Sequence, residues 1–334
     1  MGDAGEPIDR VALGTWLSGV VRIDRAGEEP FAKAYGFANR PEGIPNTVDT
    51  RFGLASGTKG FTALTVMSLV EDGSLTLDTT ARSVLGDDLP LIDDAVTVEH
   101  LLTHRSGIGD YYDEDLDRPI TDYTLTVPVQ ELPTIESHLS VLDGFPAKFP
   151  PDERFTYCNR GYVVLALIAE RTSGTPYHDL VLERVCRPAG LRDTAFLRSD
   201  ELPERTALGY LFEDDRDRTN VFHLPVRGAG DGGLYSTAAD IRSLWTALFD
   251  GRIVPTERVA EMVRPHTDAP AEERRYGLGF WLRPTTDAVL LTGYDAGVSF
   301  RSVHDPTDGS TVTVISNTSE GAWAVCERVE ALDW

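Results

Sequence analysis

The order of apolar and polar residues predicts strands near the start of the chain, followed by a buried helix. Residues 17–23 (LSGVVRI) and 30–36 (PFAKAYG) have the length and composition of two strands, and the polar stretch between them predicts a hairpin. Residues 56–72 then place apolar side chains on several faces of a helix, which is typical of a buried helix. Asp72 and Gly73 end this helix.

The middle of the chain, residues 75–230, is expected to be mostly helical with long loops. Helical patterns with turn residues between them cover residues 97–104, 133–142, 160–174 and 176–190. A hairpin is expected within 206–224. An amphipathic helix follows over 236–251, with Ser236 or Thr237 as its N-cap.

Strand-like runs return near the end of the chain. They cover residues 276–283, 288–293, 298–305 and 310–317, and a helical pattern over 319–334 follows them. This order predicts an α/β (α+β) fold, with an antiparallel sheet of about five strands flanked by helices and built from both chain ends. We expect residues 1–74 and 231–334 to form this sheet domain and 75–230 an inserted helical domain, with the active site between them.

Charge and composition exclude several classes of partner. The chain has 334 residues, 31 basic and 54 acidic, and its net charge of −23 disfavours nucleic acids and anionic membranes. No window of about eighteen apolar residues offers a membrane span, and the first ten residues lack signal-peptide features, so we expect a cytoplasmic protein. Its seven histidines and three cysteines have neither metal-ligand spacing nor a paired framework, so we expect no metal, cofactor or disulfide.

The first candidate chemistry is a serine and a lysine three residues apart, Ser56 and Lys59, where the buried helix begins. Positions i and i+3 share a helix face, so the hydroxyl and the amine can touch. A lysine activates a serine only if burial or a nearby cation lowers its pKa towards neutral. The alternative is a helix start with an unrelated lysine. The position at a helix N-terminus favours the nucleophile, because the dipole stabilises developing negative charge.

Two further segments carry candidate site residues. Tyr157 and Asn159 flank one residue at the start of an apolar helix. A tyrosine beside an ammonium can shuttle protons, and an asparagine can hold Lys59 or a substrate carbonyl. The same pattern also fits a core tyrosine with a helix-capping asparagine. Thr292 and Gly293 end a strand, where a glycine lets a substrate approach the backbone, although an ordinary strand end reads the same way.

In this order the three segments resemble the serine β-lactamase and penicillin-binding-protein superfamily. They are most similar to the class C β-lactamase-related serine hydrolases, which include esterases and D-amino-acid peptidases. The resemblance runs from about residue 17 to 334 and includes TRFGLASGTKGFTA, FTYCNRGY and GDGGLYSTAADIRSL. It implies the β-lactamase/transpeptidase-like fold and an acyl-enzyme mechanism without a cofactor.

The resemblance also implies a role for each matched residue. Ser56 would be acylated, and Lys59 would activate it alone or together with Tyr157. Tyr157 would protonate the leaving group and later activate the deacylating water, while Asn159 would orient the substrate and Lys59. The backbone N–H groups of Ser56 and Tyr294 would form the oxyanion hole.

One position departs from the family pattern. The third motif usually has lysine or histidine where this chain has Leu291, so an anionic substrate carboxylate loses the basic residue that would anchor it. Arg301 or another arginine is the candidate replacement. The departure disfavours β-lactamase activity and favours an esterase or amidase with a neutral or cationic substrate.

Residues outside the motifs have weaker assignments. Tyr112 lies in a long loop after residue 107 that could form a wall of the pocket, and it is a candidate substrate-binding residue, although packing of the loop explains it equally well. His104 is expected to be structural, and Cys158 to be a packing residue that points away from the site. Asp231 is expected to shape the loop near the site.

The leading hypothesis is a serine hydrolase that forms an acyl-enzyme on Ser56 and cleaves a small ester or amide. The alternatives are a β-lactamase or D-Ala/D-amino-acid peptidase, and an inactive ligand-binding member of the fold. The expected partner is a small-molecule or peptide substrate. The oligomeric state and the natural substrate are left open by the sequence.

Overall fold

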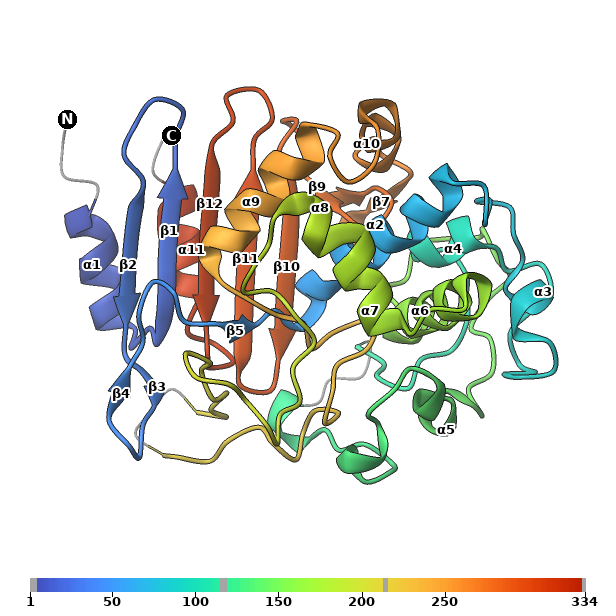
Figure 1. Ribbon diagram of the computed structural model, residues 1–334, viewed down its shortest axis with the longest axis horizontal. Coiled ribbons are helices and arrows are strands. Elements are labelled where there is room, and N and C mark those ends of the chain that lie inside the picture. The colour runs from blue at the N-terminus through green and yellow to red at the C-terminus, as the bar shows by residue number, and fades with distance from the viewer. Residues whose placement is uncertain (1–4, 115–118, 213–215, 332–334) are drawn as a thin grey trace.

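The computed structural model describes residues 5–114, 119–212 and 216–331. In these residues the largest sheet has eight strands in the order β2-β1-β12-β11-β10-β9-β8-β7, and its strand pairs are antiparallel (Figure 1). The strands are β1 Gly19–Asp24, β2 Phe31–Tyr35, β7 Thr267–Ala269, β8 Arg274–Tyr276, β9 Trp281–Leu282, β10 Val289–Asp295, β11 Val298–His304 and β12 Thr311–Ser316. The prediction of an antiparallel sheet built from both chain ends is therefore confirmed.

The expected number of about five strands was too low. The run 276–283 was expected to be one strand, but Tyr276 ends β8 and Trp281 begins β9. The backbone turns between them: Gly277 N–H donates to the carbonyl of Phe280 at 2.9 Å, and Gly279 has φ +87°. A left-handed residue inside an apolar run marks a turn that hydrophobic pattern alone does not reveal. The short strand β7 then extends the edge of the sheet.

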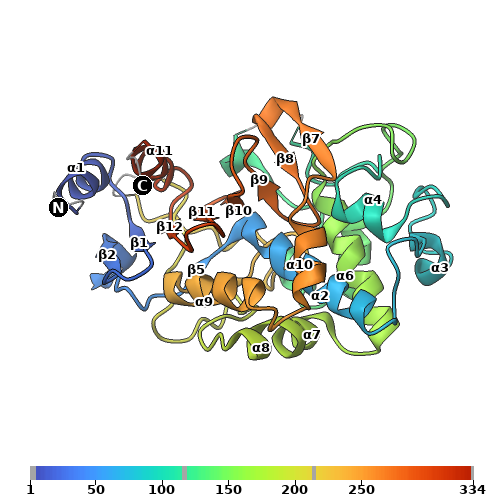
Figure 2. The ribbon, with the colours of Figure 1, turned by 90° about the horizontal axis from the view of Figure 1, so that it is seen from above.

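The sheet separates two apolar cores. Adjacent residues of β12 point to opposite faces: Val314 joins a core with α1 (Gly5–Gly14) and α11 (Trp323–Glu330). Ile315 joins the larger core with α2 (Thr58–Glu71) and α9 (Ala238–Phe249). Viewed from above, α1 and α11 lie on one side of the sheet and α9 on the other (Figure 2). Both faces of the central strands are thus buried.

Helices and short pairings fill the rest of the described chain. The helices are α3 Ala81–Leu85, α4 Val98–Leu102, α5 Leu139–Leu142, α6 Asn159–Ser173, α7 Tyr177–Val181, α8 Arg187–Ala189 and α10 Thr256–Met262, with a π-helix at Leu182–Cys186. The 3-10 turns are η1 Ala55–Gly57, η2 Ile120–Asp122, η3 Val129–Glu131, η4 Glu136–His138 and η6 Pro270–Glu272. Two small sheets pair β3 (Phe37–Asn39) with β4 (Ile44–Pro45) and β5 (Phe52–Gly53) with β6 (Tyr235–Ser236).

Caps and breakers explain most helix boundaries. Thr97 caps α4 in a capping box with His100, and Thr237 caps α9 by accepting from the N–H of Asp240. Gly174 ends α6 in the left-handed conformation, as a glycine after an apolar helix predicts. The expected helix over 133–142 is shorter, because only η4 and α5 form there.

The hairpin expected at 206–224 does not form regular strands in its described residues. Tyr210 and Thr219 make one antiparallel bridge, and the N–H of Leu211 donates to the carbonyl of Arg218 at 3.0 Å. Residues 213–215 lie outside the described part. The expected division into two domains stays a prediction.

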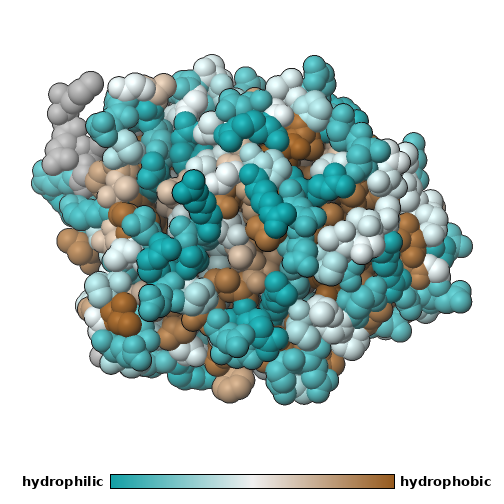
Figure 3. Space-filling view, viewed as in Figure 1, coloured by the Kyte–Doolittle hydropathy of each residue, from teal (hydrophilic) through white to brown (hydrophobic). Residues whose placement is uncertain are grey.

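The surface and the thiols match an ordinary globular chain. Hydrophilic side chains prevail on the face seen in Figure 3, where hydrophobic areas are small and separate. All three cysteines are buried and free. Among the described helices, none combines the length and the apolar character needed to cross a membrane.

Candidate active site

A turn in an unusual backbone conformation presents Ser56. The chain leaves β5 through Leu54, and Ala55 has φ +47°, a left-handed conformation that is uncommon for a residue with a Cβ atom. Ser56 follows within η1, and α2 begins two residues later. The hydroxyl of Thr58 donates to the carbonyl of Ala55 at 2.7 Å, which holds the turn. Ser56 therefore lies at the N-terminal end of a buried helix.

Lys59 lies one helical turn beyond Ser56 and is only 1% exposed. Its Nζ donates to Ser56 Oγ at 2.9 Å, to Asn159 Oδ1 at 2.8 Å and to the backbone carbonyl of Asp231 at 2.8 Å. An ammonium has three donors and no acceptor, so these three oxygens satisfy it completely. The structure thus brings together the serine and the lysine that the i, i+3 spacing placed on one face.

Tyr157 closes the other side of Ser56. Lys59 Nζ lies 4.9 Å from the centre of its ring, and the indole of Trp281 stacks on it with ring centroids 5.9 Å apart. Burial raises the pKa of Tyr157 well above its usual value, Glu114 adds to the rise, and the hydrogen bond with Ser56 opposes it. The phenol is therefore neutral at neutral pH and can donate a proton.

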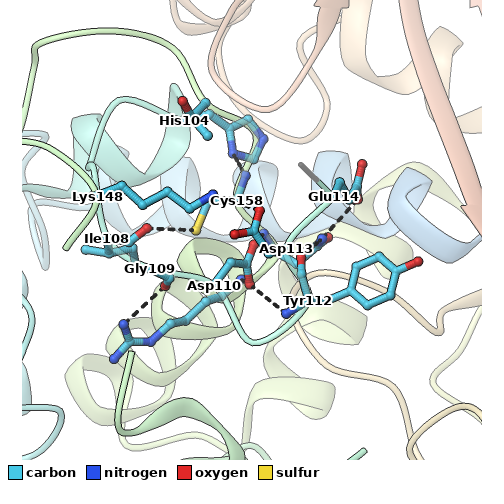
Figure 4. A network of polar contacts seen from close by, with 12 residues as sticks. His104, Ile108, Gly109, Asp110, Tyr112, Asp113, Glu114, Lys148 and Cys158 are labelled. Carbon is cyan, nitrogen blue, oxygen red and sulfur yellow. Dashed lines mark hydrogen bonds and ion pairs between the residues drawn. The ribbon is translucent and has the colours of Figure 1, made fainter. Parts of the chain in front are cut away.

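Asp110 positions the segment that carries Tyr157 and Asn159. The N-cap of α6, Cys158, provides no side-chain cap. Instead, Asp110 accepts from the backbone N–H of Asn159 at 2.5 Å and of Arg160 at 3.0 Å (Figure 4). Burial raises the pKa of Asp110 to about 6, and these backbone hydrogen bonds counteract the rise. A carboxylate at this position accepts from the unpaired N–H groups of the first helical turn, and the positive end of the helix dipole stabilises its charge.

Asn159 is oriented by partners on both ends of its amide. Its Oδ1 accepts from Lys59, and its Nδ2 donates to Glu114 Oε1 at 3.0 Å and to the carbonyl of Tyr112 at 3.3 Å. Because the ammonium form of Lys59 can only donate, the amide oxygen faces the lysine and the amide nitrogen faces the loop. The amide thus connects the lysine to the loop that contains Tyr112.

His104 and Cys158 lie behind the site and support it. The buried His104 accepts from the backbone N–H of Cys158 through Nδ1 at 3.1 Å, and its ring lies 4.4 Å from that of Tyr157. Burial lowers the pKa of His104 well below its usual value, so the ring is neutral. Cys158 Sγ points towards the carbonyl of Ile108 at 3.9 Å (Figure 4). Both residues have the packing roles that the sequence predicted.

Strand β10 passes very close to η1. A Cβ atom on Gly293 would lie 2.0 Å from the carbonyl oxygen of Leu54 and 2.9 Å from Ser56 N, so only glycine fits. Thr292 donates to the carbonyl of Phe300 at 3.2 Å. Tyr294, 43% exposed, donates to Glu320 at 2.6 Å. These predicted residues all lie along one edge of the site.

Leu291 does not face the substrate cavity. Its side chain is 2% exposed and packs against α2, where a Cβ on Gly60 would meet its Cδ2 at 2.5 Å. Where the third motif of the family that the chain resembles usually has a basic residue, the strand therefore has a leucine that packs in the core. Arg301 does not replace that residue, because it pairs with Glu330 of α11 and is absent from the walls of the cavity.

A cavity of about 680 Å³ opens above Ser56 and Tyr157. Its described walls come from the loop after residue 109, the segment after α5, η6, β9 and β10. They are Asp110, Tyr111, Tyr112, Asp113, Glu114, Pro119, Tyr123, Phe145, Glu272, Trp281, Thr292, Gly293 and Tyr294. Tyr112 is among them, and its ring meets Tyr123 edge-on at 4.3 Å. Asn159 lines a small adjoining recess.

The cavity is acidic. Four carboxylates line it, and no lysine, arginine or histidine does among the described residues. One of them, Asp113, forms an ion pair with Lys148 at 2.7 Å (Figure 4). Asp295 lies just behind the wall, where burial raises its pKa to about 7 and Asp231 adds to the rise.

Sequence reasoning missed several residues of this site. Asp110, Glu114, Glu272 and Trp281 come from three separate segments that converge only after folding. The single local signal was the acidic and tyrosine-rich character of the stretch GDYYDE.

Known proteins have this fold and are similar to the chain in sequence. The solved structure of the penicillin binding protein from Bacillus halodurans has a TM-score of 0.90 and 37% identity, and covers 97% of this chain and 99% of that one. Penicillin-binding protein 4* of Bacillus subtilis is 27% identical over 296 residues, 84% of this chain but only 63% of that protein. Esterase EstB of Burkholderia gladioli is 29% identical over 293 residues, 79% of this chain and 74% of that protein. The Beta-lactamase family model matches residues 11–332, and the chain belongs to this family.

Proposed function

We propose that the protein is a serine hydrolase that forms an acyl-enzyme on Ser56 and cleaves a small ester or amide. The observation that carries this proposal is the contact between Lys59 Nζ and Ser56 Oγ at 2.9 Å, with Tyr157 on the other side of the serine. A serine, a base within hydrogen-bond reach and a third group that orients the base are the parts that nucleophilic catalysis needs. Membership of a family that includes esterase EstB supports it.

In the acylation step, the neutral form of Lys59 accepts the Ser56 proton as Oγ bonds to the substrate carbonyl carbon. The backbone N–H groups of Ser56 and Tyr294 are the candidate donors to the oxyanion that forms. When the carbonyl reforms, the bond to the leaving group breaks, and Tyr157 gives its proton to the departing oxygen or nitrogen. Lys59 returns its extra proton to Tyr157, which restores the neutral lysine.

Water completes the cycle by the reverse route. Lys59, through Tyr157, takes a proton from a water whose oxygen bonds to the acyl carbon. When the carbonyl reforms, the bond to Ser56 Oγ breaks, Lys59 returns the proton to Oγ, and the carboxylic acid is released. Asn159 holds Lys59 through both steps, because its Oδ1 accepts from Nζ at 2.8 Å. Asp110 acts as a positioning residue, since it fixes the start of α6 beneath Asn159.

The walls of the cavity favour neutral or cationic substrates. Glu114 and Glu272 line it, Leu291 replaces the family's basic residue, and no basic side chain lines it within the described chain. A substrate carboxylate would meet like charges at short range, which disfavours binding. Esters and amides without a carboxylate are therefore the preferred class, ahead of β-lactams and peptides that end in D-Ala-D-Ala.

A fluorophosphonate probe with peptide mass spectrometry tests the nucleophile. We expect one adduct, on Ser56, in the wild-type protein and in a Ser74→Ala control at an exposed serine, and none in Ser56→Ala. An unlabelled Ser56 in folded wild-type protein would rule out the proposal and leave an inactive ligand-binding member of the fold.

A substrate panel tests the preference. We expect turnover of p-nitrophenyl butyrate and of alanine p-nitroanilide to exceed that of nitrocefin, with Ser56→Ala inactive on all of them. A faster reaction with nitrocefin would contradict the substrate class but keep the nucleophile.

A further inference from the structure

A second cavity, of about 380 Å³, lies between the sheet and α11. Its floor is a row of side chains in cross-strand register, Ile23 of β1 beside Val312 of β12 beside Val303 of β11. Cys326 and Val329 of α11 form one wall. None of its lining residues lines the active-site cavity, so it is a separate groove on the face where Figure 2 places α11.

Arginines gather at one end of this groove. Arg283 and Arg301 line it, and both pair with the same carboxylate, Glu330, at 3.3 Å and 3.2 Å. Burial lowers the pKa of the Arg274 guanidinium, and the nearby positive charges of Arg301 and Arg283 lower it further. Two guanidiniums thus pair with Glu330, and a third, that of Arg274, lies nearby. This is an unusual local excess of positive charge in a chain of net charge −23.

The cluster leaves buried donors without acceptors. Arg301 Nε and Arg274 Nη1 are buried and donate to no acceptor within residues 5–114, 119–212 and 216–331. An unpaired buried donor costs roughly 1–3 kcal/mol, more for a charged group. Asp193 is also shared by two arginines, Arg51 and Arg205, but neither of them has a buried nitrogen without an acceptor. The unpaired Nε is what distinguishes Arg301 from that pair.

The acidic residues at the other end of the groove accept hydrogen bonds from the backbone of the turn to which they belong. Asp305 accepts from the N–H of Thr307, and Asp308 from the N–H of Ser310, both at 2.8 Å. Their carboxylates hold the β11–β12 turn and leave the arginine end positive. The third arginine of the lining, Arg25, pairs with Glu28 at 3.6 Å. The groove therefore has an apolar floor and an excess of positive charge where Arg283 and Arg301 share one carboxylate.

We propose that this groove binds an amphiphilic anion, with a carboxylate or phosphate headgroup on Arg301 and Arg283 and an aliphatic chain along Ile23, Val303 and Val312. Guanidinium pairs carboxylates and phosphates through parallel N–H bonds, and the headgroup takes up the unpaired Arg301 Nε. At roughly 30 Å³ for each water-sized atom, the volume fits about a dozen non-hydrogen atoms. Decanoate has that size.

Titration of the folded protein with decanoate, decyl phosphate and decyltrimethylammonium tests the proposal. Trp323 is the reporter, because the Arg301 guanidinium lies 5.3 Å from its ring centre. We expect saturable quenching by at least one of the two anions and none by the cation of equal chain length. The preferred anion distinguishes a carboxylate ligand from a phosphate ligand.

Substitutions test whether the anion binds in this groove. Arg301→Gln should weaken anion binding at least tenfold, and Arg198→Gln should leave it unchanged. Glu330→Gln should strengthen binding severalfold, because it frees both arginines, and loss of folding cannot mimic a gain. Binding should persist in protein whose Ser56 is blocked by fluorophosphonate.

Three results would overturn the proposal. They are equal binding of the cation, anion affinity unchanged by Arg301→Gln, and weaker binding in a folded Glu330→Gln variant. Loss of binding on blocking Ser56 would assign the anion to the active-site cavity instead.

Discussion

At the scale of residues, the site depends on how Lys59 is enclosed. A side chain that is 1% exposed has no water to bind, so its three hydrogen bonds to Ser56, Asn159 and Asp231 determine where its proton can go. Two of these acceptors hold the nitrogen in place, and the third is the hydroxyl that is to be activated. The same three hydrogen bonds thus set both the position of Lys59 Nζ and the group with which it can exchange a proton.

Lys59→Met tests the base directly. Methionine keeps the apolar stem but removes the amine, so we expect the rate of Ser56 labelling by fluorophosphonate to fall by about 10²- to 10⁴-fold. The matched control is Lys33→Met, which removes an exposed lysine paired with Asp9. Labelling at the wild-type rate in folded Lys59→Met protein would assign the base to another group.

Asp295 makes stability depend on pH. Its folded pKa is raised to about 7 from an ordinary value of 3.8, so the folded state holds this proton more tightly than the unfolded chain. The stabilisation is complete below about pH 4 and is lost as pH rises to about 7. Relative to Asp295→Asn, the wild-type thermal midpoint should therefore fall by about 2 °C or more between pH 4.5 and 8.

The control for this titration is Asp87→Asn at an exposed site, where the difference from wild type should stay constant with pH. A constant difference for Asp295→Asn as well would mean that its carboxyl is solvated in the folded protein.

Residues of the site differ in how far sequence predicts them. Ser56 and Lys59 were predictable because their contact is local, within one helical turn. Asp110 was not, because it caps a helix that begins 49 residues later, and no periodicity records such a contact. Leu291 was found as a departure from the family pattern, but its burial against Gly60 follows only from the packing of β10 on α2.

At the scale of elements, the approach of β10 to η1 sets the geometry around the nucleophile. Gly293 lets the strand lie against Leu54 and Ser56, which brings Tyr294 to the same edge of the site. The pattern of apolar residues predicted β10, β11 and β12 well, since these strands alternate between two buried faces. It merged β8 with β9 because the turn at Gly277–Phe280 is itself apolar.

Gly293→Ala should therefore disable the site without touching a catalytic side chain. Its Cβ would lie 2.0 Å from the carbonyl oxygen of Leu54, so β10 must move away from η1. We expect a fall of about 10²-fold or more in the rate of Ser56 acylation, because the proposed oxyanion donors separate, and a loss of about 1–3 kcal/mol in the free energy of unfolding.

Gly14→Ala is the matched control, since a Cβ there meets nothing within 4 Å. Measured by urea unfolding and by probe labelling, the control should behave as wild type. An active and equally stable Gly293→Ala variant would show that the strand can shift without consequence.

At the scale of the whole molecule, the two ends of the chain meet in one sheet. Strand β1 pairs with β12 along six residues, and α3 to α7 from the middle of the sequence lie beyond β10, away from this pairing (Figure 1). The joining of both chain ends in one antiparallel sheet followed from the order of predicted elements and from the resemblance. The edge strand β7 and the division of the run 276–283 into β8 and β9 did not, because strands of two or three residues are too short to show a period.

The same scale decides how the molecule responds to salt. A net charge of −23 makes the folded protein repel itself, and this repulsion is screened over about 10 Å at 0.1 M salt and over about 3 Å at 1 M. We expect the thermal midpoint at pH 7.5 to rise by a few degrees between 0.05 and 0.5 M NaCl. Near the isoelectric point of about 4.6 the net charge vanishes, so the same salt step should leave the midpoint unchanged or lower it by weakening ion pairs. An equal rise at both pH values would trace the effect to the hydration of apolar surface rather than to charge.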